Sequence, residues 1–193
     1  MSNTILINKR IAYVLLITLL IVPPAGGTEV EDVIFDKQVN VGQQALEIKG
    51  VGVLRYLRFI KAYAGALYTL PGLAPETVLS DTPKRLEVEY FHALKGKDFG
   101  PATYKGLSKN LDAVEIERLR PRIDYHNSLY VDVQPGDRYS LTYLPGVGTE
   151  LALNGRPMGV IEGSDFAAAI FSLWLGKNPY DRQFKNALLG LDG

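Results

Sequence analysis

The chain has 193 residues and 21.3 kDa, a length typical of one domain. Its composition, 47% hydrophobic and 22% charged, excludes global disorder. The 21 basic and 21 acidic residues balance, which argues against a nucleic-acid binder. Cysteine is absent, which excludes disulfides, thiolate nucleophiles, Cys-based zinc sites and lipidated cysteines.

Residues 1–27 are typical of a cleaved signal peptide. Lys9 and Arg10 precede an apolar run of 12 residues, 11–22, whereas a spanning helix needs about 20. A proline pair ends the run, and small residues follow where a peptidase would cut. The alternative is a buried helix or an uncleaved anchor. Removing this segment leaves 19 basic and 21 acidic residues, a net charge of −2. We therefore expect an exported, periplasmic domain, residues 28–193, with no stable membrane anchor.

The first half of this domain is predicted to form strands. Gly42 separates two short polar and β-branched segments, which indicates a hairpin. A long run rich in aromatic and β-branched residues follows and is predicted to be one strand, ended by Pro71-Gly72. A later segment alternates between polar and apolar residues, as a half-buried strand does. The predicted strands are 38–41, 43–49, 51–70 and 85–91.

The middle of the chain changes period. Apolar residues recur at helical spacing from Asp98 to Arg118, which predicts one helix that Pro121 ends. Segment 127–133 is predicted to form a second, short helix before a turn.

A β-meander follows this turn, with strands predicted at 139–144, 149–153 and 158–161. Asn154-Gly155 is the strongest hairpin signal in the chain, because both residues accept the positive φ of a type I′ turn.

Two helices are predicted to close the sequence. Ser164 or Asp165 is expected to cap the first, which ends before Gly176. Asn178 is expected to cap the second, which ends at Gly190. The predicted fold class is α+β, a largely antiparallel sheet with helices packed on one face.

Several chemistries are excluded by missing motifs. The chain has no GxxxxGK[ST] loop, no GxSxG elbow and no HExxH motif. His92 and His126 are the only histidines, and we interpret them as structural or solvent-facing. We predict no metal site and no cofactor.

Arg55 is the candidate binding residue with the clearest physical rationale. On a single strand it would share one face with Phe59 and Tyr63. A guanidinium in such surroundings is expensive to desolvate unless an anion meets it, and its fork matches a carboxylate. Alternatively, Arg55 pairs with Glu87 or Glu89 of the next strand or extends into water.

Several short motifs follow one another along the chain after residue 27. They are Gly50-x-Gly52-x-x-Arg55 followed by Tyr63, Gly65-Ala66-Leu67-Tyr68, Gly136-Asp137, Gly163-x-Asp165-Phe166, Trp174-Leu175-Gly176 and Leu188-Leu189-Gly190. Together they resemble the bacterial chalcone isomerase-like proteins over nearly all of this part of the chain. The resemblance implies an open-faced β-sandwich, a large antiparallel sheet covered by a layer of helices, with a ligand cleft between the layers. The superfamily contains plant chalcone isomerases, non-catalytic relatives and fatty-acid-binding proteins, which hold an anionic group with a cleft arginine.

The resemblance assigns roles to single residues. Arg55 matches the cleft arginine, and Tyr63 matches a hydroxyl residue that organises a water in the plant enzymes. Tyr104 supplies a phenol if the register shifts. The remaining polar positions of the plant site fall near Phe99, Gly106 and Leu173, with Ser172 beside the last.

The sequence therefore predicts a non-catalytic binder of a fatty-acid-like or other amphiphilic carboxylate. Arg55 would clamp the headgroup and Tyr63 would donate to it. Two alternatives stay open: an isomerase (intramolecular lyase) acting on a small unsaturated carbonyl compound, and an envelope module whose cleft is filled by its own side chains. The other predicted ligand-binding residues are Phe59, Tyr104, Leu107, Phe166, Ile170 and Trp174.

Overall fold

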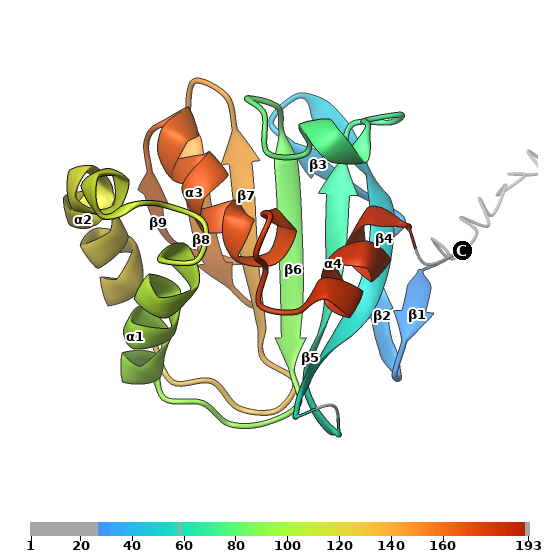
Figure 1. Cartoon of the computed structure of the whole chain (residues 1–193). Helices are drawn as coiled ribbons and strands as arrows, with labels where there is room; N and C mark the ends of the chain where they lie inside the picture. Colours follow the sequence, from blue (N-terminus) through green and yellow to red (C-terminus); the bar gives the residue numbers. More distant parts are fainter. Residues whose placement is uncertain (1–26, 58, 192–193) are drawn as a thin grey trace, which may run out of the picture.

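One antiparallel sheet dominates the computed structural model, which describes residues 27–57 and 59–191 (Figure 1). Its seven strands lie in the order β3-β4-β5-β6-β7-β8-β9, so every strand pairs with its neighbour in the chain. A separate two-stranded sheet joins β1 (Thr28–Val30) and β2 (Val33–Phe35). The strands of the large sheet are β3 (Gln38–Val41), β4 (Gln44–Tyr56), β5 (Ile60–Thr69), β6 (Lys84–Tyr90), β7 (Arg138–Leu144), β8 (Gly148–Leu153) and β9 (Arg156–Ile161).

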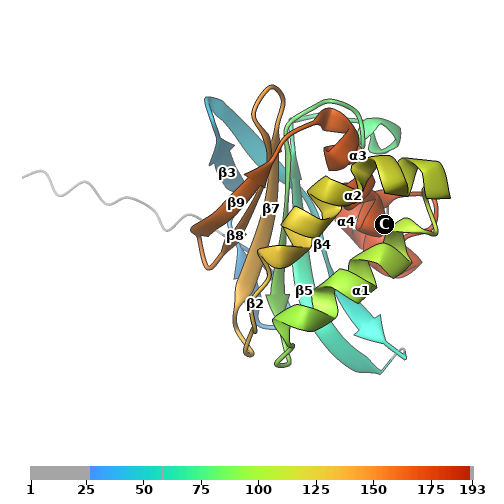
Figure 2. The same ribbon diagram turned by 90° about the vertical axis from the view of Figure 1, so that its left-hand side faces the viewer.

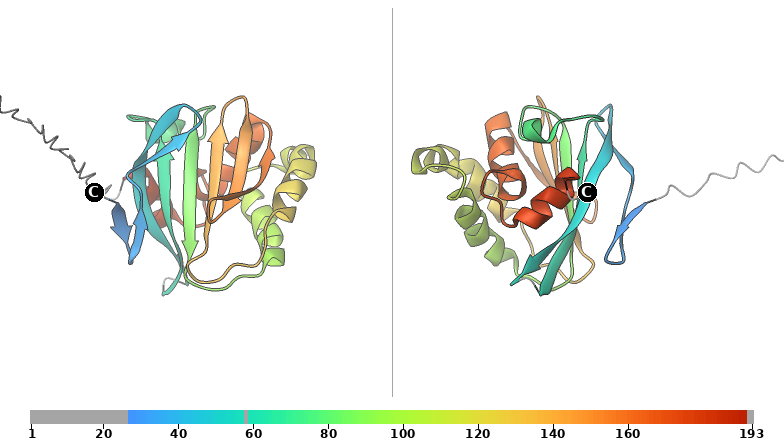
Figure 3. Two further views of the ribbon diagram at one scale, coloured as in Figure 1. Left: turned by 180° about the vertical axis from the view of Figure 1, so that it is seen from behind. Right: turned by 45° about the vertical axis from the view of Figure 1, so that its right-hand side comes forward.

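The helices cover one face of this sheet (Figure 2). The β1–β2 hairpin lies on the opposite side (Figure 3). This arrangement confirms the predicted α+β, open-faced sandwich. The helical elements are η1 (Pro75–Thr77), α1 (Gly96–Leu107), α2 (Ala113–Ser128), α3 (Ser164–Leu175) and α4 (Arg182–Leu189).

Strict alternation along β5 divides the buried residues into two cores. Tyr63 and Leu67 belong to the core under the helices. Ala64, Ala66 and Tyr68 belong to the core under the β1–β2 hairpin. Because successive strand residues point to opposite faces, both faces of the central strand are buried by different elements.

Glycines let α4 lie directly on the backbone of the sheet. A Cβ added to Gly50 would lie 2.1 Å from the carbonyl oxygen of Ala187, and one added to Gly65 would lie 2.6 Å from the Phe184 ring. No side chain fits at either position. The helix ends at Gly190, which adopts the left-handed conformation with φ 67°.

The run 51–70 is a hairpin, so the prediction of one long strand is wrong. β4 ends at Tyr56 and β5 begins at Ile60, and Arg55 lies opposite Lys61 in the register. Leu57 in the turn has φ 49°, which is unusual for a residue with a bulky side chain.

The helix predicted at 98–118 is two helices. α1 ends at Leu107, and α2 begins after Asp112, which forms a capping box with Glu115. Pro121 lies inside α2 instead of ending it. Its side chain is on the exposed face, where water can satisfy the carbonyl that the proline leaves free.

The short helix predicted at 127–133 is also wrong. α2 continues to Ser128, and Val133 forms an isolated bridge with Leu94. The Val131 amide donates to the Tyr139 hydroxyl at 2.9 Å, which holds this segment against β7.

The last hairpin is confirmed, whereas the caps of the last two helices differ from the prediction. Asn154 and Gly155 have φ of 50° and 77°. Gly163 precedes α3 with no side-chain cap. Asp181, and not Asn178, caps α4, because its carboxylate accepts from the Phe184 amide at 2.7 Å.

The predicted signal peptide, apart from Gly27, lies outside the described residues. Within residues 27–57 and 59–191, no helix has the length and apolar character needed to cross a bilayer.

The contact between α4 and β4 predicts the effect of one substitution. Gly50→Ala should lower the free energy of unfolding by about 1–3 kcal/mol, the usual cost of overpacking, measured by urea denaturation. Gly100→Ala in α1 is the control, because its Cβ would lie 3.7 Å from the nearest atom, so its stability should be equal or higher. A stable Gly50→Ala variant would contradict the packing described for α4.

Candidate functional site

An apolar cavity of about 290 Å³ lies between the sheet and the helices. It forms where β5 begins and β6 ends, and α1 and α3 cover it. The lining residues are Tyr63, Tyr90, Leu94, Asp98, Phe99, Ala102, Thr103, Tyr130, Leu173, Trp174 and Tyr180.

Aromatic rings that pack on one another form the cavity wall. The Tyr63 and Tyr90 rings meet edge to face at 5.5 Å between centroids, and Tyr90 meets Phe99 in the same way at 6.0 Å. Phe99 stacks on Tyr130 at 4.3 Å. These geometries are the favourable ones for aromatic pairs, so the wall is a connected, packed surface.

The phenol groups of this wall are neutral hydrogen-bond donors. The Tyr63 hydroxyl accepts a hydrogen bond from Trp174 Nε1 at 2.8 Å. Burial is the main cause that raises the pKa of Tyr63, Tyr90 and Tyr130 well above the usual range, and neighbouring phenols raise it further. All three therefore keep their protons at physiological pH.

The hydroxyl protons of Tyr63, Tyr90 and Tyr130 have no acceptor within the described part of the chain. Tyr180 differs, because its hydroxyl donates to the Ala102 carbonyl at 3.0 Å and joins the segment after α3 to α1. All three residues line the cavity, so their phenols are candidate donors to a bound molecule.

Charge is scarce at the cavity. Among its described lining residues Asp98 alone is charged, and its side chain is exposed. No lining residue within the described ranges is basic.

Two predicted site residues, Tyr63 and Trp174, come together in the cavity wall. Leu107, Phe166 and Ile170 lie in the core beneath the helices, fully or almost fully buried, and are not among the lining residues. They support the wall from behind.

Arg55 is not brought to the cavity. Its Nη2 lies 2.7 Å from a carboxylate oxygen of Glu31 in the β1–β2 turn, and Lys61 Nζ lies 2.5 Å from the other oxygen. Leu54 packs against the core beneath the helices, and Arg55, one residue later, extends to the opposite side. The acidic partner of Arg55 is therefore Glu31, and not Glu87 or Glu89 as considered from the sequence.

Those two carboxylates, Glu87 and Glu89, belong to a separate ion-pair network on the outer face. Arg138 lies 3.2 Å from Glu87 and 2.6 Å from Glu89, and Arg85 lies 2.7 Å from Glu87. The Arg138 guanidinium also lies over the Phe35 ring at 4.6 Å, which holds the β1–β2 hairpin on the sheet.

Phe59 and Tyr104 also lie away from the cavity. Phe59 is 85% exposed beside the β4–β5 turn and lines an outer groove with Lys61 and His92. The Tyr104 hydroxyl donates to Asp124 of α2 at 2.5 Å, so this phenol joins two helices.

Most of the lining residues were not predicted. Tyr90 lies directly opposite Tyr63 in the register of β5 and β6. Tyr130 follows α2, and Tyr180 precedes α4. The alternation of segment 85–91 predicts that Tyr90 lies on a strand, but its pairing with Tyr63 depends on the order of the strands in the sheet. No local sequence pattern indicates that Tyr130 and Tyr180, which lie in loops, reach the cavity.

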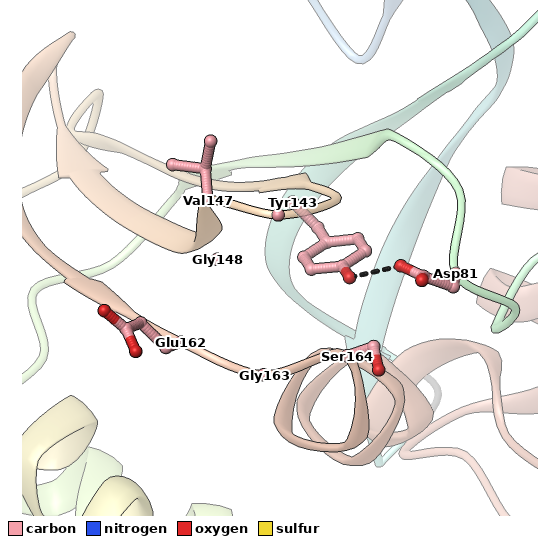
Figure 4. A pocket seen from close by; sticks show the side chains of 8 residues that line it. Asp81, Tyr143, Val147, Gly148, Glu162, Gly163 and Ser164 are labelled. Carbon is pink, nitrogen blue, oxygen red and sulfur yellow. Dashed lines mark hydrogen bonds between the residues drawn. The ribbon is translucent and has the colours of Figure 1, made fainter.

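A second hollow, about 260 Å³, lies at the other end of β6 (Figure 4). Its lining includes Asp81, Tyr143 and Ser164, and the Tyr143 hydroxyl donates to Asp81 at 2.5 Å. Nearby Lys84 is buried, which lowers its pKa to about 8, and its ammonium donates to the carbonyls of Ser80 and Thr82. The hydrogen bonds of Tyr143 and Lys84 therefore hold the loop that precedes β6 in place.

His126 is buried behind the cavity wall. Its ring lies 5.1 Å from the Tyr130 ring and 5.6 Å from the Phe166 ring, between centroids. Neither ring nitrogen has a hydrogen-bond partner among the described residues. Burial lowers the pKa of His126 to about 4. In the described part of the chain, no group of three His, Asp or Glu side chains could hold a metal ion.

The burial of His126 predicts a pH-dependent stability. Below pH 6.5 the unfolded state binds a proton that the folded state rejects, so the free energy of unfolding should fall by about 3 kcal/mol between pH 6.5 and 4. Urea denaturation at several pH values measures this loss, and His126→Phe should remove that part of the slope. An equal slope in both proteins would contradict the assignment.

Comparisons with known proteins agree with this architecture. A search of curated protein sequences found no significant match. A crystal structure of a fatty-acid binding protein of Arabidopsis thaliana matches with a TM-score of 0.63 and 16% identity, over 82% of this chain and 92% of that one. At this identity the match shows a shared fold. The family model described as "Chalcone isomerase-like" matches residues 27–190, so the chain belongs to the chalcone isomerase-like family.

Proposed function

We propose that this protein is a non-catalytic binder of a small amphiphile with a fatty-acid-like hydrocarbon chain, held in the cavity between the sheet and the helices. The observation that carries the proposal is the partly open aromatic cavity, lined by phenols whose protons have no acceptor among the described residues. Ligand pockets typically combine an apolar wall with a few polar groups that orient the ligand. The shared fold with a fatty-acid binding protein supports the same reading.

The size of the cavity limits the ligand. At about 30 Å³ per water-sized group, a volume of about 290 Å³ holds about ten non-hydrogen atoms. A medium-length chain therefore fits inside, and a longer chain would extend past the exposed lining residues Leu94 and Asp98.

The geometry favours a binder over an isomerase. Stabilising a phenolate substrate or a developing enolate requires a cation or strong donors at the reacting oxygen. The phenols supply neutral donors, but Arg55 is bound to Glu31 on the other face of the sheet. The cavity wall is therefore suited to holding a molecule rather than to changing its charge.

The cavity contains its own reporter, because Trp174 is the only tryptophan in the chain. Titration with medium-chain amphiphiles should change its fluorescence with a saturable dependence on concentration, and native mass spectrometry should show bound ligand. Ala102→Phe, which adds a ring at the exposed edge of the cavity, should weaken binding at least tenfold. Ala102→Ser, a change of one atom, is the matched control.

Absence of saturable binding by any amphiphile, together with no co-purified lipid, would overturn the proposed function. Equal binding by the Ala102→Phe and Ala102→Ser variants would place the ligand elsewhere on the protein.

We also propose that the protein acts after export, in the periplasm. The charge and length of the N-terminal segment support this, and the family match begins only at residue 27. Expression of the full chain in a bacterial host should yield a protein whose measured mass lacks about the first 27 residues, in the periplasmic fraction. Removal of Lys9 and Arg10 is expected to reduce processing, and an unprocessed protein in the cytoplasm would contradict the proposal.

A further inference from the structure

We infer that the cavity selects amphiphiles whose polar end is a neutral hydrogen-bond acceptor, such as a ketone or an ester, over amphiphiles that end in a carboxylate anion. This inference rests on the proposed function, because it concerns the ligand of the same cavity.

Unpaired donors are the first reason. Tyr63 uses a lone pair to accept from Trp174, and its proton remains free to donate. Tyr90 lies against Tyr63, and the Phe99 ring connects Tyr90 to Tyr130. The phenols of Tyr63 and Tyr130 are also near enough to Tyr90 to raise its pKa. Three phenols whose protons have no acceptor among the described residues therefore belong to the cavity lining, and they suit a group that accepts hydrogen bonds and does not donate them.

The missing cation is the second reason. Phenols also donate to carboxylates, but an anion enclosed by aromatic rings loses its hydration, and that cost is large unless a cation pairs with it. No basic side chain in the described ranges lines the cavity. Arg55 and Lys61 both bind Glu31 on the outer face. A carbonyl oxygen has a much smaller desolvation cost and gains the same donors.

Asp98 at the opening adds to this selection. Among the described residues that line the cavity, Asp98 alone carries a charged side chain. It disfavours an anionic headgroup at the opening. Salt and the nearby Lys95, with which Asp98 interacts, reduce this effect because both side chains are exposed. A neutral headgroup carries no net charge for the Asp98 carboxylate to repel.

A matched series of ten-carbon ligands tests the inference by isothermal titration calorimetry at pH 8, where decanoate is ionised. The series is 2-decanone, 1-decanol, decanoate and decane. We expect 2-decanone to bind at least tenfold more tightly than decanoate, and more tightly than decane, which has no acceptor.

Variants identify the groups responsible. Tyr90→Phe and Tyr130→Phe should each weaken 2-decanone binding two- to tenfold, the range for one hydrogen bond, and change decane binding by a smaller factor. Asp98→Asn should strengthen decanoate binding and change 2-decanone binding by a smaller factor. Tyr125→Phe, which removes a partly exposed phenol outside the cavity lining, is the matched control and should change neither.

Tighter binding of decanoate than of 2-decanone would overturn the inference. In that case Arg55→Ala and Arg58→Ala would show whether an arginine supplies the charge, Arg58 being outside the described residues. Equal affinity for decane and 2-decanone would overturn it as well, since the hydroxyls would then contribute nothing. Failure of all four ligands, in contrast, would overturn the proposed function itself.

Discussion

The alternation of side chains along β4 and β5 determines which residues can meet a ligand. The sheet is covered on both faces, by helices on one and by the β1–β2 hairpin on the other. Each strand residue therefore belongs to one environment or the other. Leu54 and Tyr63, paired across the strands, face the helices. Arg55 follows Leu54 directly and reaches Glu31 on the opposite side.

The two faces are stabilised by different interactions. Beneath the helices, aromatic and aliphatic side chains pack around the cavity, and glycines bring α4 onto the backbone of the sheet. On the outer face, Arg138 joins Glu87, Glu89 and the Phe35 ring and holds the hairpin in place. Arg55, Lys61, Arg85 and Arg138 all pair with carboxylates on the outer face, and no basic residue is among the described residues that line the cavity.

Local signals predicted much of the fold. The Asn154-Gly155 turn and the Gly42 turn are at positions where backbone with positive φ is required, so the residue type reveals the turn. The β4–β5 turn escaped prediction because Leu57 adopts positive φ without a glycine or proline to indicate it. Pro121 predicts the end of a helix, but it lies inside α2, because a proline on the exposed face of a helix does not have to end it.

The site was less predictable than the fold, for a topological reason. Tyr63 and Trp174 were found through a family pattern, and the structure joins them with a hydrogen bond. Tyr90, Tyr130 and Tyr180 come from a strand, the segment after α2 and the loop before α4. Only the folded chain places them together. Arg55 was assigned through the same family pattern, and the structure pairs it with Glu31. The turn after Tyr56 removes the single strand face that Arg55 was expected to share with Phe59 and Tyr63.

The interlocked rings of the cavity wall have a further consequence, for the entropy of binding. Tyr63, Tyr90, Phe99 and Tyr130 each hold a neighbour in place, and each has few rotatable bonds to freeze. A ligand therefore enters a preorganised surface and does not have to order the side chains that receive it. Most of the entropic cost falls on the ligand's own chain, so stiffening that chain is a more effective route to tighter binding than adding contacts to the wall.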